Sequence, residues 1–155
     1  MNPETPRKAV KLNLSAPVAL TRELLPEMIE SGGRICLFSS LSGMVPLPFI
    51  STYNATRAGI ISFGRSLASE LRDTPAQVTV ISPRAVETAL VNRIKSVYRS
   101  IGWGVDSPER VAEIALRATA LGKTHVVIGG LEKLGPILAV AAPGLLRRAL
   151  EPFRE

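Results

Sequence analysis

The sequence has 155 residues, of which 46% are hydrophobic and 21% charged, and its formal net charge is +6. This length and composition fit a single globular domain with its own core and exclude an intrinsically disordered chain. The basic residues are scattered, without a dense Lys/Arg run interleaved with aromatic residues, so we expect no nucleic-acid binding.

A long helix is the first predicted element. Apolar residues recur at intervals of three and four over residues 7–29, which is the spacing of one helix face. Pro17 should kink or interrupt this helix, because proline blocks a backbone hydrogen bond, and the Gly32–Gly33 pair should end it. The first ten residues are polar and contain two prolines, so they do not have the pattern of a signal peptide.

A buried strand is predicted next, over Arg34–Ser39, where a short apolar run lies between a glycine pair and a serine pair. Cys36 in this run is the only cysteine of the sequence. It cannot form an internal disulfide, and it has no second cysteine or nearby histidine at metal-ligand spacing. We therefore expect a buried Cys36 side chain, no metal site, and a reducing, cytoplasmic compartment.

A second long helix is predicted over residues 51–71, where apolar residues form one stripe and no proline occurs. Gly59 and Gly64 weaken a helix by up to about 1 kcal/mol each relative to alanine. We therefore expect another element to pack closely against this helix at both glycines.

Two further strands are predicted over residues 77–81 and 124–128, separated by a helix that begins at Ser107-Pro108-Glu109. Strands that alternate with helices indicate right-handed crossovers and a parallel sheet. The expected fold is α/β, a partial Rossmann-like, doubly wound parallel sheet of about three strands with flanking helices. His125 begins the last strand. A catalytic histidine needs a partner and none is evident, so we interpret His125 as a structural residue.

We divide the chain into an α/β part, residues 1–130, and an amphipathic C-terminal tail, residues 131–155. The apolar part of the tail, residues 134–146, contains two prolines and is shorter than the roughly 20 residues of a membrane-spanning helix. Packing on the sheet or at a dimer contact is the first interpretation of the tail. Weak contact with a membrane surface through its basic end is the second.

Tyr53 and Arg57 are the residues with the clearest chemistry. They lie four positions apart at the start of a helix, so their side chains share one face. A phenol is a poor acid–base group at neutral pH, and a fixed cation beside it favours the phenolate. Ser40 follows a strand, at the edge where α/β sheets present ligand-binding groups. The Tyr-x-x-x-Arg pair by itself is weak support for a site, because helices contain many such pairs.

The combination of motifs resembles the short-chain dehydrogenase/reductase family. A strand ends in the Ser-Ser-x-x-Gly pattern of residues 39–43, and residues 53–57 resemble the Tyr-x-x-x-Lys helix of the family. A later strand ends in Ser82-Pro83 with Thr88 downstream, as in the Pro-Gly turn and threonine of the family. The resemblance covers about Pro3 to Ile128 and corresponds to the C-terminal, catalytic portion of the family.

The resemblance implies an NAD(P)-dependent oxidoreductase that transfers a hydride between nicotinamide and a small-molecule carbonyl or alcohol. Tyr53 would exchange a proton with the substrate oxygen, Ser40 would position that oxygen, and Asn13 would hold a helix open for a proton-relay water. Arg57 would favour the phenolate and bind the nicotinamide ribose. The implied catalytic residues are Asn13, Ser40, Tyr53 and Arg57, and the implied cofactor-binding residues are Tyr53, Arg57, Pro83, Val86 and Thr88.

Several departures from the family pattern leave the function open. The sequence contains no glycine-rich pyrophosphate turn, so we expect a truncated, impaired enzyme that shows no measurable binding of NAD or NADP. Arg57 replaces lysine and keeps the charge with a different shape. Arg84 replaces the glycine after Pro83, which indicates either a phosphate contact or relaxed constraint.

The alternative is a non-catalytic dimerisation or scaffold protein derived from the family. The family helices that correspond to residues 7–29 and 51–71 pack across a dimer interface, so a homo-oligomer is expected. Without preceding strands, the strand at residues 34–39 should be a sheet edge with unpaired backbone groups.

Overall fold

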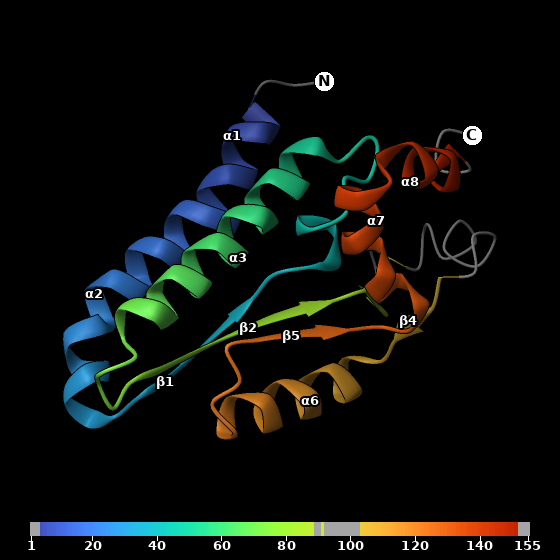
Figure 1. Ribbon diagram of the computed structural model, residues 1–155. Helices are drawn as coiled ribbons and strands as arrows, with labels where there is room; N and C mark the ends of the chain where they lie inside the picture. The colour runs from blue at the N-terminus through green and yellow to red at the C-terminus, as the bar shows by residue number, and fades with distance from the viewer. Residues whose placement is uncertain (1–3, 89–90, 92–102, 152–155) are drawn as a thin grey trace.

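The computed structural model describes residues 4–88, 91 and 103–151. A parallel sheet lies between two helical layers, as Figure 1 shows. The sheet has the order β1 (Arg34–Phe38), β2 (Gln77–Pro83) and β5 (His125–Ile128). One face is covered by α1 (Glu4–Val10), η1 (Lys11–Ser15), α2 (Ala16–Ser31) and α3 (Ser51–Glu70), and α6 (Pro108–Ala120) covers the other. The predicted α/β class with three parallel strands is confirmed.

The main core forms where α3 packs on the sheet, around the buried side chains of Leu37, Ile60, Leu67 and Val80. A side chain at Gly64 would collide with Val80 and Leu37, and a Cβ at Gly59 would lie 2.8 Å from the Leu14 side chain. The close packing predicted at both glycines is therefore present, once against the sheet and once against the first helix.

The first helix runs from Glu4 to Ser31 without a break, and Pro17 does not end it. Instead, residues 11–15 widen to a π-turn, in which the Ala16 N–H bonds to the Lys11 carbonyl. Pro17 has no N–H to give the Asn13 carbonyl, the partner that carbonyl would have in an α-helix. Single π-turns inside α-helices are rare and occur frequently at functional sites.

β1 is an edge strand of the described sheet, since it pairs with β2 alone. Leu37 faces the helices and is buried, whereas Arg34, Cys36 and Phe38 are exposed. The prediction of a buried Cys36 is wrong, because the buried face of α6 packs on Ile81 of β2 and on β5 instead. The prediction that this strand is a sheet edge is confirmed.

Short elements complete the chain. β3 (Ala85–Val86) and β4 (Val105–Asp106) form a two-stranded parallel sheet that the sequence analysis did not predict. The tail forms η3 (Leu131–Leu134), α7 (Gly135–Ala141) and α8 (Pro143–Ala149). Its Leu146 and Leu150 pack on Leu41, Val45 and Leu47 after β1. Among the described residues, no helix has the length and apolarity needed to cross a membrane.

Candidate functional site

A cavity of about 450 Å³ opens where β1 and β2 end. Four of the predicted site residues line it: Ser40 after β1, Tyr53 in the first turn of α3, Pro83 at the end of β2 and Val86 in β3. Carboxyl ends of neighbouring parallel strands meet at one edge of a sheet, which explains why residues far apart in sequence converge here.

Ser40 is held by the short helix η2 (Leu41–Gly43), whose N-cap it forms. Its Oγ accepts the Ser42 N–H at 3.2 Å, so its own hydroxyl proton stays available to a ligand oxygen. Gly43 lets η2 approach α3, since a Cβ there would lie 2.7 Å from the carbonyl carbon of Arg57. Ser39 ties the same elements together, because its Oγ donates to the Arg57 carbonyl at 2.8 Å.

Tyr53 is half-buried, and the first turn of its helix is tied to the preceding loop. The Asn54 amide donates to the Leu47 carbonyl at 2.7 Å, and the Thr56 hydroxyl donates to the Tyr53 carbonyl at 2.8 Å. These bonds fix the first turn of α3, so the phenol enters the cavity from a rigid element.

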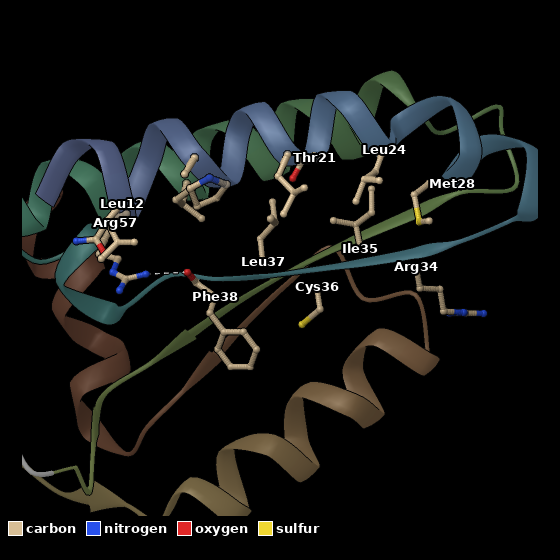
Figure 2. A pocket seen from close by; sticks show the side chains of 15 residues that line it. Leu12, Thr21, Leu24, Met28, Arg34, Ile35, Cys36, Leu37, Phe38 and Arg57 are labelled. Carbon is tan, nitrogen blue, oxygen red and sulfur yellow. Dashed lines mark hydrogen bonds between the residues drawn. The ribbon is translucent and has the colours of Figure 1, made fainter. Parts of the chain in front are cut away.

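Arg57 lies beside Tyr53 but outside this cavity. Its Cζ is 4.8 Å from the centroid of the Tyr53 ring, a cation–π distance. Its Nη1 donates to the Phe38 carbonyl at 2.9 Å. Together with Asn13 it lines a separate groove of about 660 Å³ between the first helix and β1, shown in Figure 2. The predicted catalytic quartet is thus divided between two hollows, with Tyr53 and Arg57 in contact between them.

Thr88 is not brought into the cavity. It is exposed, and its Oγ1 accepts the Val91 N–H at 3.3 Å. Trp103 lines the cavity in addition to the predicted residues.

A buried ion cluster surrounds Arg84, and it was not predicted from the sequence. The guanidinium donates from Nε and Nη2 to the two Asp106 oxygens at 2.9 and 3.0 Å, and from Nη1 to Glu132 at 2.9 Å. Both carboxylate side chains are only 3% exposed. Glu132 also accepts the backbone N–H groups of Gly104 at 2.8 Å and Gly130 at 2.7 Å. Arg84 therefore already has two carboxylate partners, which disfavours a phosphate contact.

The cluster shifts the protonation of its members in the direction expected for a paired site. The Asp106 carboxylate is the main cause that raises the pKa of Arg84, against the opposing effect of burial. Burial alone would raise the pKa of Glu132, but hydrogen bonds from the Gly104 backbone and from Arg84 lower it overall. The helix start at Ser107-Pro108-Glu109 was predicted from the sequence, but nothing in the spacing linked the preceding Asp106 to Arg84 or Glu132.

His125 has a partner, so the interpretation that it has none is wrong. Its Nε2 shares a hydrogen bond of 2.9 Å with Ser82 Oγ on the neighbouring strand. The register pairs Val80 with His125 and Ser82 with Val127, so the two side chains are diagonal neighbours on one face. Burial and, less strongly, the charge of Arg65 lower the pKa of His125. Ser82 is fully buried, which makes this pair structural.

Comparison with known proteins agrees with this geometry. A family model described as short chain dehydrogenase matches residues 1–98. The chain is 32% identical over 153 residues to dehydrogenase/reductase SDR family member 7B of Mus musculus, covering 93% of this chain and 47% of that protein.

Solved structures of oxidoreductases also resemble this chain. A 3-oxoacyl-[acyl-carrier protein] reductase of Brucella melitensis has a TM-score of 0.72 at 27% identity, with 83% of this chain and 54% of that chain covered. A 4-hydroxyisoleucine dehydrogenase complexed with NADH and succinate has a TM-score of 0.65 at 28% identity, with 84% and 59% covered. The chain spans about half the length of the relatives it matches.

Proposed function

Since this chain belongs to the short-chain dehydrogenase/reductase family, we propose that it carries the proton-transfer and substrate-positioning side of a nicotinamide-dependent oxidoreductase. The substrate would be a small molecule with a carbonyl or hydroxyl group. The observation that carries this proposal is the single cavity in which Ser40 and Tyr53 meet at the end of the sheet.

In this proposal Tyr53 gives its phenolic proton to the carbonyl oxygen of the substrate, or takes the proton from an alcohol. The Ser40 hydroxyl donates to the same oxygen and fixes its position. Val45 and Leu47, both buried, form an apolar wall that keeps water from the reacting centre. The nicotinamide cofactor would supply the hydride.

The described residues fit only the nicotinamide end of such a cofactor. Pro83 and Val86 offer an apolar wall and backbone groups beside Tyr53. The pyrophosphate end finds no matching group, because the sequence lacks the glycine-rich turn and Arg84 is bound to Asp106 and Glu132. We therefore expect this chain alone to bind NAD or NADP too weakly to measure by titration calorimetry.

A chimaera tests the proposal. This chain would replace the matching part of the Brucella melitensis reductase, and NADH or NADPH oxidation would be followed with a panel of small carbonyl compounds. Tyr53→Phe removes only the phenolic oxygen and should lower kcat/KM by about 10²-fold or more. Ser66→Ala, an exposed hydroxyl on the same helix, is the matched control. Equal kcat/KM for the chimaera and its Tyr53→Phe variant would refute the proposed role.

One observation favours a second candidate, a non-catalytic dimerisation or scaffold protein. The Arg57 guanidinium is bonded to the Phe38 carbonyl and does not line the cavity that holds Ser40. If this arrangement prevents catalysis, Arg57→Lys should raise the activity of the chimaera, because the narrower ammonium group can leave the strand. A chimaera without turnover before and after this substitution supports the second candidate.

A further inference from the structure

The cavity that holds Ser40 and Tyr53 has an apolar wall and one charged side chain. Its apolar part is formed by Leu41, Val45, Leu47, Ile50, Val86 and Trp103. Among the residues that the structure describes, Arg84 is the only charged one that lines it. In the proposed function Ser40 and Tyr53 take the reacting oxygen, so the rest of a substrate meets the apolar wall and Arg84. The state of Arg84 therefore decides whether the cavity favours a charged or an uncharged substrate.

The charge of Arg84 is compensated inside the protein. Its guanidinium donates to both oxygens of Asp106, at 2.9 and 3.0 Å, and to Glu132 at 2.9 Å. The exposed Arg110 lies 3.6 Å from Asp106, so two carboxylates balance two guanidinium groups. This cluster leaves no excess positive charge at the cavity wall for a bound anion.

The same cluster keeps the guanidinium where it is. A Cβ at Gly104 would collide with the guanidinium of Arg84, which therefore fills the space beside that glycine. Glu132 accepts the Gly104 N–H at 2.8 Å in addition to its bond with Arg84. The carboxylate that neutralises Arg84 thus also holds the backbone next to Trp103, which is half-buried in the cavity wall.

We propose that this cavity selects uncharged carbonyl or hydroxyl compounds with an apolar group beside the reacting carbon, and that Asp106 and Glu132 set this selectivity by neutralising Arg84. The inference rests on the proposed function for the orientation of the substrate. An anionic substrate would lose the hydration of its charge without gaining an uncompensated cation. An apolar group gains by leaving water for the wall around Trp103. Asp106 and Glu132 act through Arg84, so they are positioning residues.

The fluorescence of Trp103 tests the proposal in the full chain, without a cofactor. Trp103 is the only tryptophan of the sequence and lines the cavity, so its emission reports a bound ligand. The probes are trans-4-methylcyclohexanol and trans-4-hydroxycyclohexanecarboxylate, which share the ring and the hydroxyl and differ in a methyl group against a carboxylate. We expect a saturable change with the first and a Kd about tenfold higher or more with the second. N-acetyltryptophanamide corrects for collisional quenching.

A charge-neutralising variant separates the cluster from the apolar wall. Asp106→Asn with Glu132→Gln removes both anionic partners and leaves Arg84, so the preference for the methyl compound should shrink to about threefold or less, or reverse. Glu109→Gln with Glu113→Gln is the matched control, because it changes the net charge equally at two exposed positions of α6. This control should keep the preference of the unmodified chain. Far-UV circular dichroism checks that each variant is folded.

Three results overturn the proposal. They are no saturable response to the methyl compound, equal or tighter binding of the carboxylate by the unmodified chain, and an unchanged preference in the folded double variant. If the double variant does not fold, Glu132→Gln alone takes its place and should reduce the preference about threefold or more, because Arg84 then keeps one carboxylate. The titration needs no turnover. A chimaera whose kcat/KM does not depend on Tyr53 would refute the proposed function and leave a measured charge preference intact.

Discussion

Removal of the Arg84 side chain gives the sharpest test of the structural argument. In Arg84→Met an unbranched apolar chain replaces the guanidinium. The buried Glu132 carboxylate loses its cation, and the buried Asp106 carboxylate keeps only the exposed Arg110 at 3.6 Å. Breaking a buried ion pair from one side costs about 3–5 kcal/mol. We take about 3 kcal/mol, the low end, because Arg84 is 18% exposed and Glu132 keeps two backbone N–H bonds.

Urea unfolding measures this loss. With a slope of about 1–3 kcal/mol/M, a loss of about 3 kcal/mol lowers the midpoint by about 1–3 M. Arg72→Met is the matched control, because Arg72 contacts Asp73 at 3.1 Å with both side chains at least 79% exposed. An exposed pair contributes about 0–1 kcal/mol.

If the urea midpoint of Arg84→Met equals that of Arg72→Met, the buried ion pairs of Arg84 do not stabilise the fold more than an exposed pair does. A triple variant that also neutralises both carboxylates, with Asp106→Asn and Glu132→Gln, should recover part of the loss, since no uncompensated charge then remains. Failure to recover any stability would show that the loss comes from packing around the side chain.

Further predictions concern pH and packing. Folding lowers the pKa of Glu132, so the contribution of its carboxylate to stability is complete above the unfolded pKa of about 4.5 and is lost as pH falls through the folded pKa. In Glu132→Gln the urea midpoint should therefore depend less on pH below about 4.5. The pKa of His125 is also lowered by folding, so the unfolded state takes up the proton first and the urea midpoint falls as pH drops below about 6.5. His125→Gln should remove this fall of the midpoint. An equal fall in His125→Gln and in the parent chain would show that His125 does not cause it. Gly64→Val should lower the free energy of unfolding by about 1–3 kcal/mol, measured by thermal unfolding, because Val80 occupies the space. Gly144→Val should lower it much less, because no atom lies within 4 Å of that position.

Regular elements with long periodic patterns could be predicted from sequence. The strands and the two long helices follow from local apolar patterns, and the family motifs point to Ser40 and Tyr53 in one cavity. Cys36 shows the limit of such patterns. An apolar run indicates that other elements bury the strand, but whether an element covers each of its two faces depends on the rest of the fold.

The site residues that prediction missed depend on long-range pairing. Arg84 meets Asp106 because the two-residue strands β3 and β4 pair, and strands that short leave no periodic signal. Arg84 meets Glu132 because β2 pairs with β5. The bond between Ser82 and His125 likewise depends on the register of β2 with β5. Arg57 was predicted as a cation beside Tyr53, and it lies there. Its hydrogen bond to the Phe38 carbonyl could not be predicted, because that carbonyl is available only at an unpaired strand edge.

The pairing of β3 with β4 closes the segment between them independently of the main sheet. Ala85 and Val86 lie against Val105 and Asp106, and the Glu87 N–H bonds to the Asp106 carbonyl at 2.9 Å, with Arg84 fastened to the same residue. The entry and exit of the intervening segment are thus held together whatever its sequence. Because loop closure costs only about 0.6 kcal/mol for each doubling of length, segments of other lengths can be exchanged here at little cost to the sheet. The packing of the sheet therefore sets no fixed length for the segment that joins β3 to β4.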